Sequence, residues 1–535
     1  MLVLLGSCGG GSGHGNSNTG GSASSGNTAP ATTFGTDVLT YHDDAMRSGQ
    51  DLSESVLTPQ NVATASFGKL RILAADGVVD ATPLIVSGLT IAGSKRNVVY
   101  VASEHDSVYA YDADTGALLA QVSLLGSAES TSDTRGCDQV SPQIGITSTP
   151  VIDRASGPNG TLYVVAMSRD AGGTYHQRLH ALDLLTLADR LPPQEIQARA
   201  PGNGPNSDGG MLQFDPKQYK ERAALLLAGG RIYLAFASHC DIAPYNGWIM
   251  AYDETSLAQT HVLQITPNGI DGAIWDTGGM AADSAANIYA PVGNGTFDTT
   301  LDGAGMPGQQ DFGNAALKIS TSGATLAIAD YFTPANTVSE SANDIDFGSG
   351  SMLLLVDQLD AAGTVHHLLV AGGKDGNLYL LDRDDMGHYS AAGDAVYQRI
   401  AVGGALYSAP IYYDGSVYVG DAGGTLKAYA FSNAKLPATP SSQSAQTFAY
   451  PGTAPAISAQ GSSNAILWAV RSAQGAPAVL DAFNPADLGQ QYYSSSQAAG
   501  GRDDFGNGNK FVTPVIANGK VFIATPDGVA VFGPR

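Results

Sequence analysis

Positive charge is scarce in this sequence. Only 26 of its 535 residues are Lys or Arg, against 49 Asp or Glu, and the net charge at pH 7 is −23. A chain this negative repels phosphate backbones and anionic headgroups, which excludes nucleic acid binding and a basic membrane-binding surface. No apolar run reaches the roughly 18 residues of a membrane-spanning helix, so an integral helical membrane protein is excluded as well.

Glycine, in contrast, is abundant. The chain has 66 glycines, about 12% of its residues, where roughly 7% is usual. Hydrophobic residues make up 43% of the chain, so it is not disordered and can build one or two large cores. High glycine with low charge and many Val, Ile and Tyr residues favours short strands joined by tight turns.

The N-terminus reads as a processing signal and a tether. The residues LGSC that end at Cys8 resemble a bacterial lipobox, and residues 9–35 are a Gly/Ser-rich stretch typical of a flexible spacer. Residues 1–8 are too few for a complete signal, so we expect the true start codon upstream. We therefore expect lipidation of Cys8 and anchoring in the bacterial cell envelope, with Gly9 favouring the outer membrane. The alternative is an accidental LGSC before a disordered tail.

Besides Cys8, the sequence has only two cysteines, Cys137 and Cys240. In an exported protein an even pair indicates one disulfide, although 103 residues separate the two. Two buried free thiols are the alternative that the sequence leaves open.

From residue 80 onward one pattern recurs: an apolar strand, a turn, a Tyr-centred strand, another turn and a strand that often ends in Asp. Successive copies lie about 60 residues apart, a period typical of propeller blades. The centres of the second strands are Tyr100, Tyr163, Tyr233, Tyr289, Leu369, Tyr418, Trp468 and Phe522. We predict an all-β fold over residues 67–535, an eight-bladed β-propeller of four-stranded antiparallel blades, after a lead-in segment at 36–66. Seven blades are the alternative, because the copies at 287–319 and 464–483 are weak.

The last repeat indicates how the ring closes. It contains only three strands before the chain ends, and an unpaired edge strand invites aggregation. Phe67–Leu73 reads as a strand that has no partner near it in sequence. We expect this N-terminal strand to complete the last blade.

The repeats resemble those of a known family. The residues AYDADTG at Ala110–Gly116, where Asp112 starts a turn and Gly116 ends it, resemble the repeat of pyrroloquinoline quinone (PQQ) propellers, the quinoprotein alcohol dehydrogenase-like family. The family has a docking Trp four residues after the Gly, where this chain has Ala120. The resemblance implies the propeller fold.

Two segments resemble the cofactor site of that family. Trp275 precedes Gly293-Asn294-Gly295 at the spacing where family members carry the Trp beneath PQQ and an Asn that binds calcium. The resemblance implies that Trp275 binds the cofactor and Asn294 the metal, roles that suit a flat aromatic ring and an amide oxygen. The alternatives are a blade-packing aromatic and a turn residue.

A further part of the resemblance involves Asp241 and the cysteines. Asp241 lies one residue from the position of a calcium-binding Glu, and Cys137 matches the second of two adjacent cysteines that lie over the quinone. If Cys137 pairs with Cys240, these segments converge on one axial site. The alternative for Asp241 is a solvated turn. In addition, Thr333-Pro334 followed by Asn343–Asp346 resembles the Thr-Pro loop of the family.

The catalytic residues of the family are not all matched. The resemblance places a general-base Asp in the strand at Ala315–Gly323, which here reads AALKISTSG and has no carboxylate. No CxxCH motif for haem is present, and His366 and His367 are adjacent in a strand, so they face opposite ways and cannot share a metal.

Two functions therefore stay open. The first is an exported lipoprotein that binds a quinone-like or other small ligand with Ca²⁺ at the mouth of the channel, up to and including a quinoprotein dehydrogenase. The second is a non-catalytic envelope propeller that serves as a protein-interaction scaffold. In both, we expect a monomer that contacts the membrane only through its lipid anchor.

Overall fold

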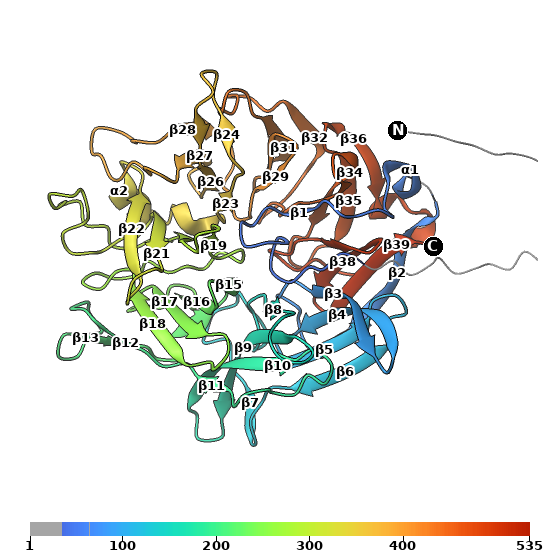
Figure 1. Cartoon of the computed structure of the whole chain (residues 1–535), viewed down its shortest axis with the longest axis horizontal. Helices are drawn as coiled ribbons and strands as arrows, with labels where there is room; N and C mark the ends of the chain where they lie inside the picture. The colour runs from blue at the N-terminus through green and yellow to red at the C-terminus, as the bar shows by residue number, and fades with distance from the viewer. Residues whose placement is uncertain (1–34, 64) are drawn as a thin grey trace, which may run out of the picture. The chain divides into compact units, whose positions relative to one another are not determined.

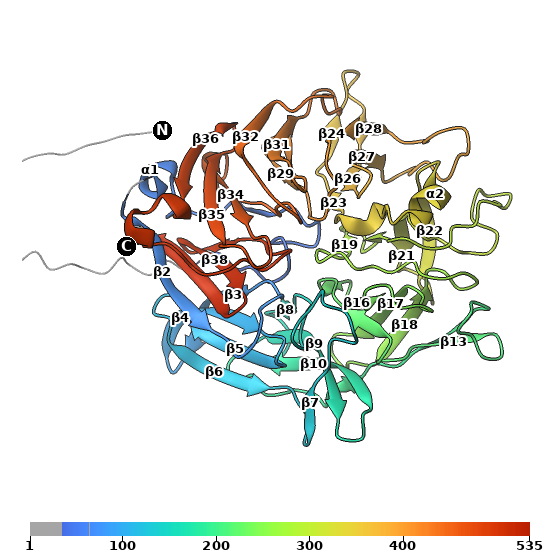
Figure 2. The same ribbon diagram turned by 180° about the vertical axis from the view of Figure 1, so that it is seen from behind.

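The structure, a computed structural model, describes residues 35–63 and 65–535. The predicted lipidation site at Cys8 and nearly all of the predicted tether lie outside the described residues. Within them, eight antiparallel sheets are arranged around a central axis (Figure 1, and Figure 2 from behind). The predicted eight-bladed β-propeller is thereby confirmed.

The blades follow one another along the chain, and each has four main strands. From the innermost strand outward, blades 1 to 4 consist of β3 (Leu84–Ile91), β4 (Ser94–Ala102), β5 (Ser107–Asp112) and β6 (Leu118–Ser123); β8 (Val151–Asp153), β9 (Thr161–Asp170), β10 (Tyr175–Asp183) and β11 (Gln194–Glu195); β15 (Leu226–Ala228), β16 (Arg231–Ser238), β17 (Trp248–Asp253) and β18 (Gln259–Gln264); and β19 (Ala281–Ala282), β20 (Ile288–Pro291), β21 (Ala316–Ser320) and β22 (Ala327–Phe332).

Blades 5 to 8 repeat this order. They consist of β23 (Leu353–Leu354), β26 (Leu368–Gly372), β27 (Asn377–Asp382) and β28 (Gln398–Ala401); β29 (Ile411–Tyr413), β30 (Ser416–Gly420), β31 (Thr425–Ala430) and β32 (Ser442–Thr447); β33 (Ala456–Gln460), β34 (Ser463–Arg471), β35 (Val479–Asn484) and β36 (Asp487–Ser494); and β37 (Val515–Ala517), β38 (Lys520–Thr525), β39 (Gly528–Pro534) and β2 (Phe67–Ala74). Every predicted second-strand centre lies in the second strand of its blade.

The remaining elements decorate this ring. The additional strands are β1 (Gln50–Asp51), β7 (Glu129–Thr131), β14 (Tyr219–Glu221), the hairpin β12 (Arg199–Pro201) with β13 (Met211–Gln213), and the hairpin β24 (Gln358–Leu359) with β25 (Val365–His366); the helices are α1 (Pro59–Val62), α2 (Thr337–Ala342) and the short 3₁₀ turns η1 (Phe347–Ser349), η2 (Ser495–Gln497) and η3 (Ala499–Gly501). Among the described residues, no helix combines the length and apolar character needed to cross a membrane.

The N-terminal strand closes the ring as predicted. β2 pairs antiparallel with β39, from Phe67 opposite Pro534 to Ala74 opposite Gly528. The pairing covers the edge of β39, which would otherwise be the unpaired outer strand of a three-stranded blade. An exposed edge of this kind invites aggregation.

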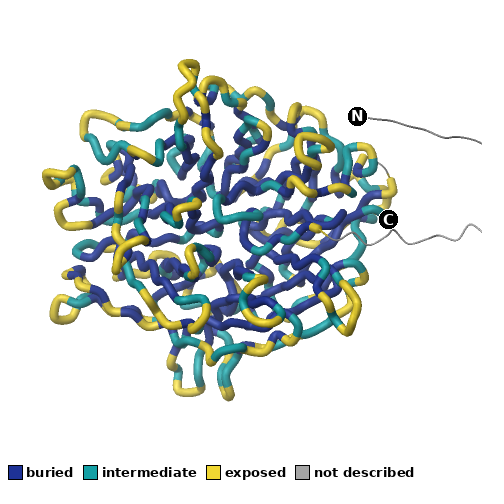
Figure 3. Tube along the Cα trace, in the orientation of Figure 1, coloured by how far each residue is buried: buried dark blue, intermediate teal, exposed yellow. Residues whose placement is uncertain are grey.

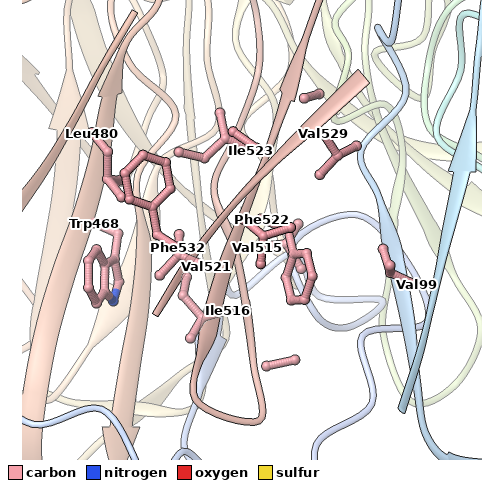
Figure 4. Close-up of a cluster of buried hydrophobic side chains, with 14 of the residues drawn as sticks. Val99, Trp468, Leu480, Val515, Ile516, Val521, Phe522, Ile523, Val529 and Phe532 are labelled. Atoms are coloured by element: carbon pink, nitrogen blue, oxygen red, sulfur yellow. The ribbon is translucent and has the colours of Figure 1, made fainter. Parts of the chain in front are cut away.

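The hydrophobic core lies between neighbouring blades. Figure 4 shows one such cluster, where Trp468 of β34 and Phe532 of β39 pack across the boundary between blades 7 and 8. Val99 of β4 extends the same cluster into blade 1. Burial is concentrated in the strands and exposure in the peripheral loops (Figure 3), so the recurring feature of each repeat, a short apolar strand, is what holds the ring together.

The segment at Thr36–Asp51 fills the centre of the ring, where Figure 1 draws it in blue. It hydrogen-bonds to the innermost strand, or to a residue beside it, in every blade. The pairs are Val38 with Ile85, Leu39 with Ile152, Arg47 with Leu225, Ala45 with Ala282, Met46 with Leu354, Ser48 with Tyr412, Gly49 with Ile457 and Thr36 with Asn518. The sequence predicted only a lead-in here; we call Thr36–Asp51 the axial segment.

Arg47 anchors the axial segment. Its side chain is fully buried and donates hydrogen bonds to the carbonyl oxygens of Met280 (2.9 Å) and Tyr41 (2.9 Å) and to the hydroxyl of Thr40 (2.8 Å). Burial lowers the pKa of Arg47 to about 10, which leaves it charged at neutral pH. The buried guanidinium is satisfied by fixed oxygens, and it ties the axial segment to the loop that enters blade 4.

Candidate functional site

A cavity of about 320 Å³ is formed by the loops that enter the blades. Its lining includes Cys137 from blade 2, Asp241 from blade 3 and Trp275 from the loop that enters blade 4. Three of the four residues predicted for the cofactor and the metal thus share one cavity, whose size lies in the range of small-molecule sites.

A disulfide forms one wall of the cavity. Cys137 and Cys240 are bonded, with their Cα atoms 5.5 Å apart, across 103 residues of sequence. Cys137 is buried and Cys240 is exposed. The bond joins the loop before β8 to the loop between β16 and β17, and it therefore fixes the blade 2 side of the cavity to the blade 3 side.

Trp275 lies half-buried in the cavity with cations on its ring. The Arg222 guanidinium and the Lys374 ammonium each lie 5.7 Å from the ring centre. Gly293 makes this arrangement possible, because a Cβ atom there would lie only 3.0 Å from the indole and 2.8 Å from the carboxylate of Asp346. Aromatic face and flanking cations together suit a flat ligand that carries negative charge.

Asp346 forms an ion pair inside the cavity. Lys374 Nζ lies 2.5 Å from Asp346 Oδ2 and 2.7 Å from Asp344 Oδ1, and the backbone N–H of Asn294 donates to Asp346 Oδ1 at 2.5 Å. Burial raises the pKa of the Asp346 carboxyl above its usual value, although Lys374 and the Asn294 amide act in the opposite direction. Burial alone would lower the pKa of Lys374, but Asp346 and Asp344 outweigh it and raise that pKa to about 12.

The carboxylates of the cavity lie on elements other than the strand where the resemblance places a general base. That strand is β21, where Lys318 Nζ donates to the carbonyl oxygen of Arg383 and does not line the cavity. The carboxylates of the cavity come instead from Asp241, Asp344 and Asp346. The sequence signal for Asp344 and Asp346 was the acidic run at residues 343–346 after the Thr-Pro loop. This run resembled the family, but no role was assigned to it.

Of the two predicted metal ligands, Asp241 lines the cavity and Asn294 does not. Asn294 Oδ1 is buried with no hydrogen-bond partner, while its amide nitrogen donates to Asp344 (2.9 Å). Asp241 is exposed and accepts from the Tyr245 hydroxyl (2.8 Å). Burial raises the pKa of Tyr245, and the negative charges of Asp241, Asp271 and Asp346 raise it further.

These groups fit a calcium ion incompletely. In the described part of the chain, no three His, Cys, Asp or Glu side chains are arranged to hold a metal. Calcium takes six to eight oxygen ligands, and Asn294 Oδ1 with Asp241 supplies at most three. The protein therefore offers part of a calcium shell, and a bound ligand or water must supply the rest.

Three further groups on the cavity wall were missed by the sequence analysis. Among the described residues, nothing accepts a hydrogen bond from the side chains of Lys220 or Arg222, and both ring nitrogens of the buried His239 lack a partner. Burial lowers the pKa of Lys220 to about 8 and that of His239 to about 3. An unsatisfied buried polar atom is costly, so the His239 ring calls for a hydrogen-bonding ligand, and the two cations favour a ligand that carries negative charge.

Solved structures share this fold. The quinohemoprotein alcohol dehydrogenase of Comamonas testosteroni is similar with a TM-score of 0.61 and 14% identity, over 93% of this chain and 80% of that one. A quinohemoprotein alcohol dehydrogenase of Pseudomonas putida is similar with a TM-score of 0.57, 14% identity and the same coverage. At this identity the likeness shows the propeller fold alone. No protein-family model matches the chain, and no curated protein matches its sequence.

Proposed function

We propose that the cavity binds a quinone cofactor of the PQQ type and that the protein is an exported quinoprotein dehydrogenase that oxidises alcohols. One observation carries the proposal: Trp275, the Cys137–Cys240 disulfide and the Asp346–Lys374 ion pair all line the same cavity. A flat stacking surface, a rigid wall and a buried base are the parts that such a site needs.

The residues of the cavity fit the charge of such a cofactor. PQQ is planar and carries carboxylates, and Lys220 and Arg222 are cations that lack an acceptor within the described residues. Carboxylates of the cofactor would give both cations charged hydrogen-bond acceptors. His239 adds a neutral hydrogen-bonding group on the same wall. Trp275 provides the surface on which the ring system stacks.

Asp346 is the proposed general base. A bound quinone supplies the two-electron acceptor. Asp346 accepts the hydroxyl proton of the alcohol, and its raised pKa makes it a stronger base than an exposed aspartate. Lys374 holds the carboxylate in place through its ion pair and keeps it ionised at neutral pH.

Calcium is proposed as a co-ligand of the cofactor. Because the side chains supply so few oxygen atoms, the ion should bind to the protein only when the cofactor completes its shell. Asn294 and Asp241 would be the protein ligands. Export and anchoring through Cys8 complete the proposal and rest on the lipobox-like sequence alone.

The test is a titration of the purified protein with PQQ, followed by its unfolding temperature. A ligand that binds only the native state adds about 2.7 kcal/mol of stability at a hundredfold excess over its Kd. We expect this gain with PQQ and Ca²⁺ together and little with Ca²⁺ alone. Trp275→Ala and Lys220→Met should each remove most of it, while Lys435→Met, at a lysine outside the cavity, should not.

Activity is tested separately by dye-linked alcohol oxidation. Asp346→Asn should retain PQQ binding and lose about 10²- to 10⁴-fold in turnover, the usual contribution of a general base. No stabilisation by PQQ, with or without Ca²⁺, would refute the proposal and leave the interaction scaffold as the better interpretation.

A further inference from the structure

An arc of aromatic rings forms the side of the cavity opposite the disulfide. The ring centres of Trp275 and Tyr407 lie 6.4 Å apart, those of Tyr407 and Tyr450 5.0 Å, and those of Tyr450 and Phe511 6.1 Å. The Arg222 guanidinium closes the arc, 4.5 Å from the Phe511 ring and 5.7 Å from that of Trp275. The rings come from the loops that enter blades 4, 6, 7 and 8, far apart in sequence.

The arc leaves aromatic surface open to a ligand. The Tyr407–Tyr450 and Tyr450–Phe511 contacts are edge-to-face, at 78° and 82°, so the rings do not stack on one another and each contact covers the face of one ring only. Tyr450 is 48% exposed. Part of its ring surface is therefore available to a ligand in the cavity. Within the described chain, the hydroxyl groups of Tyr407 and Tyr450 make no hydrogen bond.

The arc also lies beside the proposed base. Tyr407 has Lys374, Asp344 and Asp346 as its charged neighbours, and burial raises the pKa of its hydroxyl. A molecule whose hydroxyl reached Asp346 would therefore place its body against Tyr407 and Tyr450. No other group of rings lines this cavity among the described residues.

The charges around the arc limit what can bind there. Arg222 and Lys374 already occupy the cation positions at Trp275, so a cationic substrate would be repelled. Asp344 and Asp346 are charged neighbours of Tyr407 and disfavour an anionic substrate at that end of the cavity. A neutral, planar body is the class that remains, because it stacks on or packs edgewise against the rings without either repulsion.

We infer that the substrates of this site are neutral aromatic primary alcohols, held by the Tyr407, Tyr450 and Phe511 rings of the arc, while Trp275 is left to the quinone. The inference rests on the proposed function, which supplies the reaction. The alcohol carbon is oxidised to the aldehyde; its hydroxyl proton goes to Asp346, and its C–H hydrogen leaves with two electrons to the bound quinone, the oxidant.

The test measures binding without turnover. Benzyl alcohol and cyclohexylmethanol, which match in size but differ in planarity, are titrated into the PQQ-free protein by ligand-observed NMR. We expect benzyl alcohol to bind at least fivefold more tightly. Tyr450→Leu and Tyr407→Leu should each weaken benzyl alcohol by about three- to tenfold and leave cyclohexylmethanol unchanged. Tyr492→Leu, outside the cavity, is the matched control.

The outcomes separate this inference from the proposed function. Equal affinity for the two alcohols, or no effect of Tyr450→Leu and Tyr407→Leu, would overturn the aromatic arc as a substrate site even if PQQ binds. Failure of PQQ to bind would overturn the proposed function, while the planar selectivity of the unloaded cavity would still support the arc. Tyr450 is half exposed, so its replacement should leave the fold intact.

Discussion

Replacing Lys374 by Met should destabilise the protein in a way that depends on pH. Lys374 and Asp346 have side chains that are 16% and 6% exposed, and removing one partner of a buried ion pair costs about 3–5 kcal/mol because a charge is left unpaired. We expect the lower end, about 3 kcal/mol at pH 8.5, since the backbone N–H of Asn294 still donates to Asp346.

The sign of the pH dependence follows from Asp346. Its pKa is already raised by burial in the folded protein, and loss of Lys374 should raise it further. A carboxyl with a raised folded pKa binds more protons folded than unfolded, so stability falls as pH rises from the unfolded value toward the folded one. As the pH falls, a larger share of Asp346 is protonated in the variant than in the wild type, so the loss relative to wild type should be smaller at pH 5 than at pH 8.5.

Urea unfolding followed by tryptophan fluorescence at pH 5 and pH 8.5 measures both losses. The double variant Lys374→Met with Asp346→Asn should lose less than the two single variants together, because neither charge is left alone. Lys435→Met, at a lysine with no ion pair among the described residues, is the control and should show no pH-dependent loss. An equal loss at the two pH values would refute the reasoning.

Three further results are expected. Alkylation of unreduced protein should find no free thiol at Cys137 or Cys240, and reduction should cost up to about 4–5 kcal/mol; labelling of both cysteines before reduction would contradict the bond. Arg47→Met should lower the free energy of unfolding in urea by about 2–4 kcal/mol, since three buried oxygens lose their donor; an unchanged free energy of unfolding would deny Arg47 its anchoring role. Cys8→Ala should release the protein from host membranes, and a variant that still fractionates with membranes would end that idea.

The blades could be predicted from the sequence because each repeats the same local pattern. A Tyr-centred strand is a short apolar run buried on both faces, and the turn at Asp112 has its own chemistry: the carboxylate accepts from the backbone N–H groups of Asp114 and Thr115, and Gly116 takes a φ of +77°. Such signals are local, so eight copies could be counted and the closing strand identified as the one left without a partner.

Local sequence patterns could not identify the axial segment or the place of Asp346 in the cavity. The axial segment bonds to the blades mainly through its backbone, and backbone hydrogen bonds leave no pattern in the side chains. Asp346 reaches the cavity from an irregular loop after α2, where insertions shift every spacing. The fixed spacing of the family therefore pointed to Trp275, which lines the cavity, and gave no signal for Asp346.

The axial segment has a consequence for how the chain reaches this structure. Thr36, near the beginning of the described chain, bonds to Asn518 across 482 residues, and the residues between them contribute every blade that the segment touches. Contacts this distant form slowly, because a long loop must close before any of them is gained. During synthesis, the earliest residues must wait for the last blade before the centre can be completed. We expect late, all-or-none consolidation of the ring, with a half-made chain exposing strand edges that a chaperone would cover.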